Sequence, residues 1–332
     1  MENKIIALVT AVHRDRYQII TTEYGEIYGK LKAANYYHGL KDERFPTVGD
    51  RVEIEYNNLG DSLILETLPR KSKFLRLNPT PGMGEQLVAA NFDYVFITMS
   101  MNYDFNIKRL ERYLSIAWKS GGTPVVVLTK ADLTTNATEY VVKTMMVAPG
   151  VTVVPVSAIT GEGMDQIFYY LQKNVIIVLL GSSGVGKSTF INALLKDQVM
   201  KTSEIREDDS KGHHTTTHRQ LLFLKNGAML IDTPGMRTMG MTEDTQGISR
   251  LFEDVEELIK KCRFADCTHH NEPGCAVLKA LEEGNIPMER WINYQKLMKE
   301  ARFLSEKNSK KQKSTIFRKP CRTMKYKEDY DD

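Results

Sequence analysis

The segment VIIVLLGSSGVGKSTFIN, residues 175–192, decides how this chain folds. Its first six residues are apolar and rich in β-branched side chains, as in a short parallel strand, and Gly181 ends that run. Apolar residues then recur at helical spacing, at Phe190, Ile191 and Leu194. Residues 181–188 match the pattern GxxxxGK[ST], so the sequence predicts a phosphate-binding loop (P-loop) between a strand and a helix.

The spacing of this loop suits phosphate binding. Small residues let backbone N–H groups curl around phosphate oxygens at the positive end of the helix. Lys187 then reaches the β- and γ-phosphates, and the Ser188 hydroxyl binds Mg²⁺. A glycine-rich turn that matches by chance is the alternative, but the flanking strand and helix argue against it. The predicted nucleotide-binding residues here are Gly181, Ser182, Ser183, Gly184, Val185, Gly186, Lys187, Ser188 and Thr189.

Two motifs upstream of the loop indicate the base. VVVLTKADL (125–133) is a strand that ends in TKAD, and VTVVPVSA (151–158) is a strand that ends in SA. In [NT]KxD motifs the Asp carboxylate accepts hydrogen bonds from guanine N1–H and the 2-amino group, which adenine cannot match, so Asp132 is the predicted specificity residue. TKAD alone could be a surface turn, but a second motif beside a P-loop lowers that chance. The other predicted base-site residues are Thr129, Lys130, Ala131, Ser157 and Ala158.

Downstream, MLIDTPG (229–235) is a strand ending in DTPG. Asp232 is predicted to hold Mg²⁺ through water, and the Gly235 N–H to sense the γ-phosphate. The polar stretch 201–222 takes the position of a first switch, whose threonine closes on Mg²⁺. Its register stays open between Thr215, Thr216 and Thr217.

The motif order is therefore guanine motif, SA motif, P-loop, switch and DTPG, a circular permutation of the usual GTPase order. GEQLVAANFDYVFITMSMNYDFNIKRLERYL (84–114) precedes these motifs, and a Cys and His cluster follows them. Together they resemble the ribosome small-subunit-dependent GTPase A family, also called ribosome biogenesis GTPases. The resemblance covers nearly the whole chain and implies a GTPase that the small ribosomal subunit stimulates and that acts in late assembly of that subunit.

The water-positioning group is not obvious. Ras-like enzymes place a Gln after DxxG, but Met236 can neither orient nor polarise water. The family pattern GRHTTT reads GHHTTT at 212–217, so His214 matches and His213 replaces an Arg. We predict His214 as the catalytic residue, with a solvated loop residue or an RNA contact as the alternative. Without a fixed water-orienting group, hydrolysis by the isolated protein should be slow.

The Cys and His cluster, CRFADCTHHNEPGC, has the spacing CxxxxCxHxxxxxC. Three thiolates and one imidazole can close a tetrahedral Zn²⁺ site without an open position, which predicts a structural metal. Buried free thiols near histidines are the alternative. The cluster matches the family's zinc motif at Cys262, Cys267, His269 and Cys275, with His269 preferred over His270 on spacing.

The predicted fold class is α/β, in three units. Residues 1–70 contain five short period-two strands (5–12, 17–21, 26–32, 51–56 and 62–67) and should close into a small barrel, which in this family is an RNA-binding OB-fold. Residues 71–245 alternate strands (93–100, 125–129, 151–157) and helices (107–119, 137–147, 163–173), so a permuted GTPase domain with a parallel sheet is expected. Residues 246–332 hold an amphipathic helix at 248–261, the zinc motif, a helix at 290–306 and a basic tail.

Charge and aromatic residues indicate an RNA partner. Between 296 and 327 there are twelve Lys or Arg and two acids, a net +10 in a chain whose total is +3. A solvated tail or surface is the alternative, but the family resemblance favours rRNA. Candidate contacts in the first unit are Arg14, Arg16, Tyr36, Tyr37, His38, Lys41 and Arg44.

With 42% hydrophobic and 26% charged residues, the chain has a composition typical of globular proteins. It has no apolar run of eighteen residues, so we expect a cytoplasmic protein without membrane contact, and nothing demands more than a monomer. Its small ligands should be GTP, GDP, Mg²⁺ and one Zn²⁺. Two alternatives remain: an RNA-binding module for which GTP is mainly a conformational ligand, and a permuted GTPase acting on another RNA such as tRNA.

Overall fold

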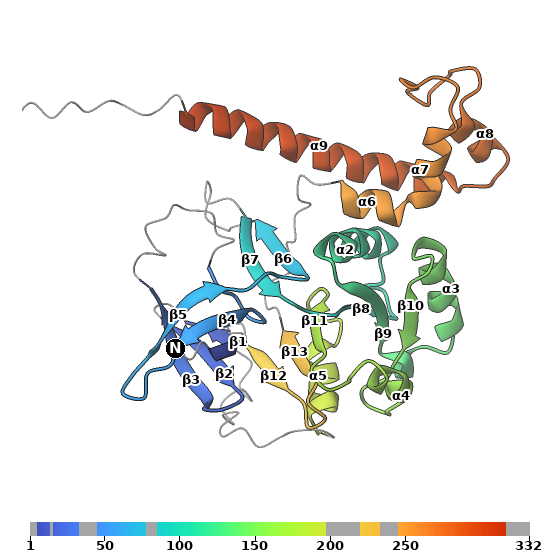
Figure 1. Cartoon of the computed structure of the whole chain (residues 1–332). Helices are drawn as coiled ribbons and strands as arrows, with labels where there is room; N and C mark the ends of the chain where they lie inside the picture. The colour runs from blue at the N-terminus through green and yellow to red at the C-terminus, as the bar shows by residue number, and fades with distance from the viewer. Residues whose placement is uncertain are drawn as a thin grey trace, which may run out of the picture.

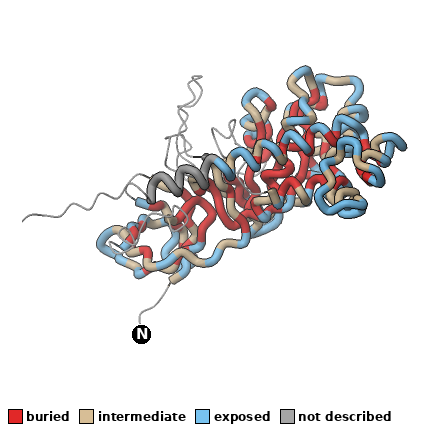
Figure 2. Tube along the Cα trace, turned by 90° about the horizontal axis from the view of Figure 1, so that it is seen from above, coloured by how far each residue is buried: buried red, intermediate tan, exposed pale blue. Residues whose placement is uncertain are grey.

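The structure is a computed structural model that describes residues 5–13, 16–32, 45–77, 85–196, 220–232 and 245–316 (Figure 1). A five-stranded barrel lies beside an α/β sheet, and a group of helices crosses above that sheet (Figure 1). Buried residues concentrate along the middle of the molecule, where barrel and sheet lie (Figure 2). Among the described residues no helix is both long and apolar enough to cross a membrane.

The N-terminal strands close into the predicted barrel. They are β1 (Ile5–Val12), β2 (Tyr17–Thr21), β3 (Gly25–Leu31), β4 (Arg51–Glu55) and β5 (Ser62–Thr67), in the order β1-β2-β3-β5-β4. The alternating side chains of these strands fill the interior, where Val9, Ile19, Val52, Ile54 and Ile64 are fully buried. β3 and β5 pair in parallel and the other pairs are antiparallel, so the barrel has the OB-like form that the sequence predicts.

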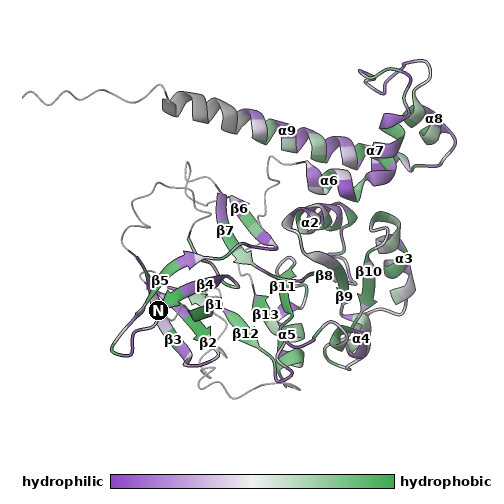
Figure 3. Cartoon of the chain, viewed as in Figure 1, coloured by the Kyte–Doolittle hydropathy of each residue, from purple (hydrophilic) through white to green (hydrophobic). Residues whose placement is uncertain are grey.

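The second sheet has the order β10-β9-β8-β11-β13-β12. Its parallel strands are β8 (Tyr94–Ser100), β9 (Thr123–Thr129), β10 (Thr152–Pro155), β11 (Ile176–Leu180) and β13 (Met229–Asp232). These strands are mostly apolar, as expected for a sheet covered on both faces (Figure 3). Their carboxyl ends therefore meet at one edge, and the predicted α/β class is confirmed.

Helices cover both faces of this sheet. Alternate residues of β11 point to opposite sides: Val178 packs in the cluster that includes α2 (Ile107–Ser120) and α3 (Ala137–Val147), and Ile177 in the cluster that includes α4 (Met164–Phe168) and α5 (Lys187–Lys196). α2 begins where the Asn106 side chain accepts from the Arg109 N–H, and ends at Gly121, whose φ of 85° favours glycine. The α4 helix is shorter than the predicted 163–173.

Two strand features were absent from the sequence prediction. β6 (Lys73–Leu77) and β7 (Glu85–Ala90) form an antiparallel hairpin between barrel and sheet, and β12 (Leu221–Phe223), which begins at the end of the expected switch stretch, pairs antiparallel with β13. Only residues 91–93 separate β7 from β8, so the two strands follow one another closely in the sequence. The hairpin also bonds the barrel connection, since the Ala90 N–H donates to the Val48 carbonyl.

The prediction of one continuous helix over 248–261 is wrong. The structure has two helices, α6 (Gln246–Leu251) and α7 (Glu253–Lys260), with the buried Phe252 between them. α6 lies so close to α2 that a Cβ at Gly247 would overlap the Ser115 carbonyl, and α7 instead packs against α8 (Ala276–Glu282). The chain bends because the two halves pack on different partners.

The last helix, α9 (Met288–Ile316), is longer than the predicted 290–306. The coloured part of this helix carries both hydrophilic and hydrophobic residues (Figure 3). Its inner side meets α2 in a buried polar contact: Asn293 Nδ2 donates to Glu111 Oε2 at 2.8 Å, and Arg290 Nη1 lies 3.9 Å from Glu111 Oε1. Arg290 also forms a bidentate pair with Asp254 of α7, at 2.7 and 2.8 Å. At the outer end Arg112 pairs with Glu300.

We expect the stability of this helix contact to fall as pH rises. Burial raises the pKa of Glu111 to about 7, whereas Arg290 and Asn293 act in the opposite direction. Because the folded state then binds the proton more tightly, stability is fully present below the ordinary pKa of 4.5 and is lost as pH rises through about 7. Glu111→Gln should remove this loss, on the order of 1 to 3 kcal/mol.

Urea unfolding at pH 5 and pH 8 checks this expectation, with Glu257→Gln on the exposed side of α7 as a matched surface control. Equal pH dependence in wild type and Glu111→Gln would contradict it.

Candidate functional site

The phosphate-binding loop joins β11 to α5 at the carboxyl edge of the sheet (Figure 1). Gly184 and Gly186 have φ of 78° and 96°, in the left-handed region that favours glycine. At Gly181 a Cβ would overlap the Thr98 hydroxyl of β8, so only glycine fits between the strands. Lys187 Nζ donates to the Gly181 and Ser182 carbonyls, each at 2.6 Å, which holds the ammonium over the loop. Ser188 and Thr189 follow in the first turn of α5.

The TKAD motif, at the carboxyl end of β9, also contacts this loop, although β8 lies between β9 and β11 in the sheet. The Thr129 hydroxyl donates to the Val185 carbonyl, and Lys130 Nζ donates to the Gly184 carbonyl at 2.7 Å. Thr129 therefore reaches the loop. Lys130 itself has a φ of 64°, and non-glycine residues in the left-handed region often mark functional sites.

The two candidate base motifs meet across β9 and β10. Ser157 Oγ donates to Asp132 Oδ1 at 2.6 Å, and the Ala131 N–H donates to the Val156 carbonyl at 3.0 Å. Asp132 is exposed, while Ala158 beside Ser157 is half-buried. A bonded serine thus orients an accessible carboxylate, which is the arrangement needed to accept two hydrogen bonds from a guanine edge.

Asp232 ends β13, and its Cα pairs in register with Leu179 of β11. Its carboxylate therefore lies at the same sheet edge as the P-loop. A carboxylate and the Ser188 hydroxyl are oxygen ligands of the kind Mg²⁺ prefers, so the two fit a magnesium site. The predicted residues His214, Thr215, Thr216 and Gly235, and also His213, Thr217 and Met236, lie outside the described residues.

A further pair of side chains reaches the loop from α2. Arg109 Nη1 donates to Ser182 Oγ at 2.7 Å and to Asp104 Oδ2 at 3.0 Å, and Nη2 donates to Asp104 Oδ1 at 3.0 Å. The hydrogen bond from Arg109 is the main reason that the pKa of Asp104 is lowered, and the charge of Lys130 contributes. The sequence carried no signal for this contact, because Arg109 and Ser182 are 73 residues apart.

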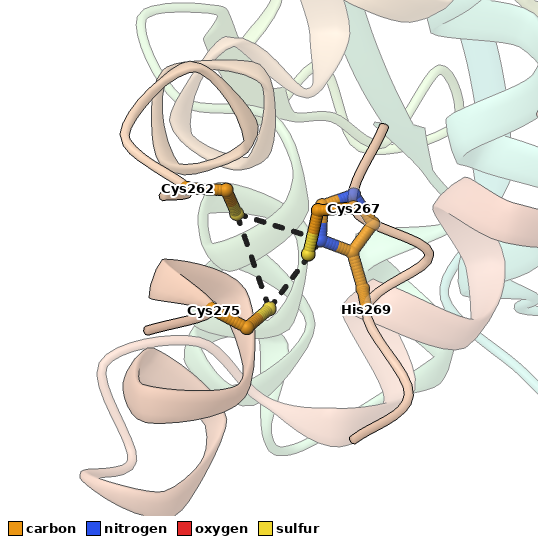
Figure 4. Close-up of side chains that lie close together, drawn as sticks. All are labelled: Cys262, Cys267, His269 and Cys275. Carbon is orange, nitrogen blue, oxygen red and sulfur yellow. Dashed lines mark hydrogen bonds between the residues drawn. The ribbon is translucent and has the colours of Figure 1, made fainter. Parts of the chain in front are cut away.

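The second site is a Cys₃His cluster at the far end of the helical group. Cys262, Cys267, His269 and Cys275 offer ligand atoms that all lie within 4.8 Å of one another (Figure 4). His269 Nδ1 is 3.6 Å from Cys262 Sγ and 3.4 Å from Cys275 Sγ, and those two sulfurs are 3.9 Å apart. Bonds to a tetrahedral Zn²⁺ would place S and S about 3.8 Å apart and S and N about 3.5 Å apart. The four residues therefore fit a zinc ion, and His270 lies outside the cluster.

Neighbouring groups hold these four residues in place. Trp291 of α9 packs edge-on against the His269 ring, with centroids 5.5 Å apart. Glu272 accepts hydrogen bonds from the backbone N–H groups of Thr268, His270 and Asn271, at 2.7, 2.9 and 3.1 Å. The Thr268 hydroxyl donates to Glu272 as well, and this bond, followed by those from the Thr268 and His270 N–H groups, holds the pKa of Glu272 far below its usual range. Glu272 thereby fixes the turn in which His269 has a left-handed φ of 60°.

Fold and site together define a circularly permuted P-loop GTPase. The RsgA GTPase family model matches residues 67–242, and the chain belongs to that family. It is 50% identical to the small ribosomal subunit biogenesis GTPase RsgA 1 of Listeria innocua, over 91% of this chain and 85% of that protein. It is 45% identical to the RsgA protein of Methanosarcina acetivorans, over 79% of this chain and 71% of that protein.

Solved structures agree with this placement. The crystal structure of YjeQ from Thermotoga maritima is similar with a TM-score of 0.69 at 28% identity, covering 90% of this chain and 98% of that one. YloQ, described as a circularly permuted GTPase, shares the fold with a TM-score of 0.62 over 92% of this chain and 96% of that one. The protein is thus a GTPase, which hydrolyses GTP to GDP and phosphate.

The base assignment can be tested by changing the carboxylate. Asp132→Asn presents an amide N–H where guanine offers its 2-amino donor, and xanthine carries a carbonyl there. We expect GTP affinity to fall by about 10²-fold or more and affinity for xanthosine triphosphate to rise. Titration with both nucleotides checks this, with the exposed Asp165→Asn in α4 as control. Unchanged preference for GTP would remove Asp132 from the base site.

The metal assignment can be tested through Glu272, which is not a ligand. Because Glu272→Gln weakens the bonds that hold the His269 turn, we expect zinc affinity to fall by about 10- to 100-fold. Competition with a chelator of known affinity measures this, and Glu283→Gln in the same unit is the control. Equal zinc retention in both variants, or less than one zinc per wild-type chain, would count against the site.

Proposed function

We propose that this GTPase acts in late assembly of the small ribosomal subunit, in the cytoplasm, and that it binds the subunit through rRNA as a monomer. The observation that carries the proposal is its 50% identity over 91% of the chain to a relative named small ribosomal subunit biogenesis GTPase. The division into 1–70, 71–245 and 246–332 then corresponds to an RNA-binding barrel, a GTPase domain and a zinc domain with a basic tail.

Two surfaces support RNA contact. On the barrel, the guanidinium of Arg16 lies 4.0 Å from the Tyr28 ring centroid, and Tyr24 stacks on Tyr56 with centroids 3.8 Å apart. Exposed aromatic rings beside a cation are a usual platform for unpaired bases. On α9, Lys296, Lys299 and Arg302 are exposed and lead toward the basic tail. Of the predicted barrel contacts only Arg16 is described; Arg14, Tyr36, Tyr37, His38, Lys41 and Arg44 lie outside the described residues.

In the proposed cycle, Asp132 and Ser157 select guanine and the P-loop holds the phosphates. Mg²⁺, held by Ser188, by Asp232 through water and by Thr215 or Thr216, would neutralise phosphate charge. GTP orders the switch and favours docking on the subunit; His214 then orients the water that attacks the γ-phosphorus. Loss of the γ-phosphate releases the switch and the protein. Zn²⁺ on the four ligands has a structural role, because it leaves no open position.

The test is GTP hydrolysis by the purified protein, alone and with small subunits, large subunits or tRNA, at low and moderate salt. We expect slow turnover alone and a rise of about 10³-fold or more with small subunits only, weakening with salt. If the protein binds small subunits in a nucleotide-dependent way but its GTP hydrolysis is not stimulated, the result favours the RNA-binding module. Stimulation by tRNA would favour a permuted GTPase that acts on another RNA.

His214→Ala should abolish the stimulation while leaving GTP affinity within about threefold, because the imidazole acts on water and not on the nucleotide. His218→Ala, in the same stretch, is the matched control. Full stimulated turnover by His214→Ala would refute the catalytic assignment without touching the ribosomal one.

A further inference from the structure

The contact of Arg109 and Asp104 with the P-loop is not part of the motifs that define a GTPase. Arg109 lies in the first turn of α2, and Asp104 lies in the connection from β8 to that helix. Their side chains are 28% and 35% exposed, so the pair lies at the protein surface beside the loop. A surface ion pair of this kind adds little to the stability of a fold. The effect of this ion pair therefore depends on where it places the Arg109 guanidinium relative to the P-loop.

The position of Ser182 relative to the phosphates follows from Lys187. The P-loop lysine reaches the β- and γ-phosphates, and here its Nζ is 2.6 Å from both the Gly181 and Ser182 carbonyls. Ser182 therefore lies at the β/γ end of the loop. Because Arg109 Nη1 is 2.7 Å from Ser182 Oγ, its guanidinium lies at that end too.

The pair also has the chemistry to hold a fixed orientation. Asp104 accepts from both Arg109 terminal nitrogens, a bidentate contact that aligns the planar guanidinium. Asp104 Oδ2 accepts in addition from Ser182 Oγ at 3.3 Å. Side-chain bonds from Arg109, Lys130 and Thr129 thus reach the loop at Ser182, Gly184 and Val185 respectively.

We propose that Arg109, aligned by Asp104, is a positioning residue for GTP: it holds Ser182, and with it the β/γ end of the P-loop, in the conformation that receives the phosphates. GTP places one phosphate more than GDP at that end, so loss of the contact should weaken GTP more than GDP and slow γ-phosphate release. The inference rests on GTP hydrolysis and not on the ribosomal role.

The test uses the full chain with Mg²⁺ and without ribosomal subunits, so that its failure is separate from failure of the proposed function. Affinities for GDP and for a non-hydrolysable GTP analogue are measured, together with single-turnover hydrolysis. For Arg109→Ala we expect analogue affinity to fall about tenfold, GDP affinity by less than about threefold, and hydrolysis by about 10- to 100-fold. Arg112→Ala, one turn further along α2, is the matched control and should change neither ratio nor rate.

A double-mutant cycle separates positioning from a general loss of structure. If Arg109 acts through Ser182, the double variant of Arg109→Ala with Ser182→Ala should be no worse than Arg109→Ala alone. Equal weakening of both nucleotides by Arg109→Ala, or strictly additive effects in the cycle, would overturn the proposal. Should Arg109→Ala melt below the assay temperature, Asp104→Asn takes its place, because it releases the ion pair and should shift the nucleotide preference in the same direction.

Discussion

The structure depends on the parallel pairing of β8 with β11. These strands are far apart in the chain, yet Tyr94 pairs with Ile177 and Ile97 with Leu180. β9 and β10 add on one side and β13 on the other, so five carboxyl ends lie along one edge. That edge, and not the order of segments, creates a nucleotide site, because a ligand meets only the ends of the strands. The chain can therefore present its guanine motifs before its P-loop without losing the geometry.

Helix α2 links this edge to the rest of the molecule. Its first turn contacts the P-loop through Arg109, its apolar side covers the sheet, and its outer side meets α6 and α9. The close approach at Gly247 and the buried Glu111 with Asn293 make the helical group part of the GTPase core, not a tethered module. A buried carboxyl is expensive unless it is bonded, so this contact favours one docking of the helices over others.

The Cys₃His cluster lies in a part of the chain that has little apolar core of its own. α7 and α8 have eight and seven residues, too short to be stable alone, and the segment between them has little apolar material to bury. Bonds from four side chains to one metal ion can replace a missing core. Trp291 packs against His269 from α9, so the Cys₃His cluster and the long basic helix are in direct contact.

The sequence by itself determined the P-loop, both candidate base motifs, the barrel strands and the four clustered ligands. Each depends on residue types at short, regular spacing, and local periodicity survives in the fold. Only the tertiary structure decided the β6–β7 hairpin, the bend at Phe252, the reach of Thr129 to Val185 and the contact of Arg109 with Ser182. These features depend on which distant segments pack together. Such long-range contacts produce no periodic pattern of residues in the local sequence, so they could not be predicted from it.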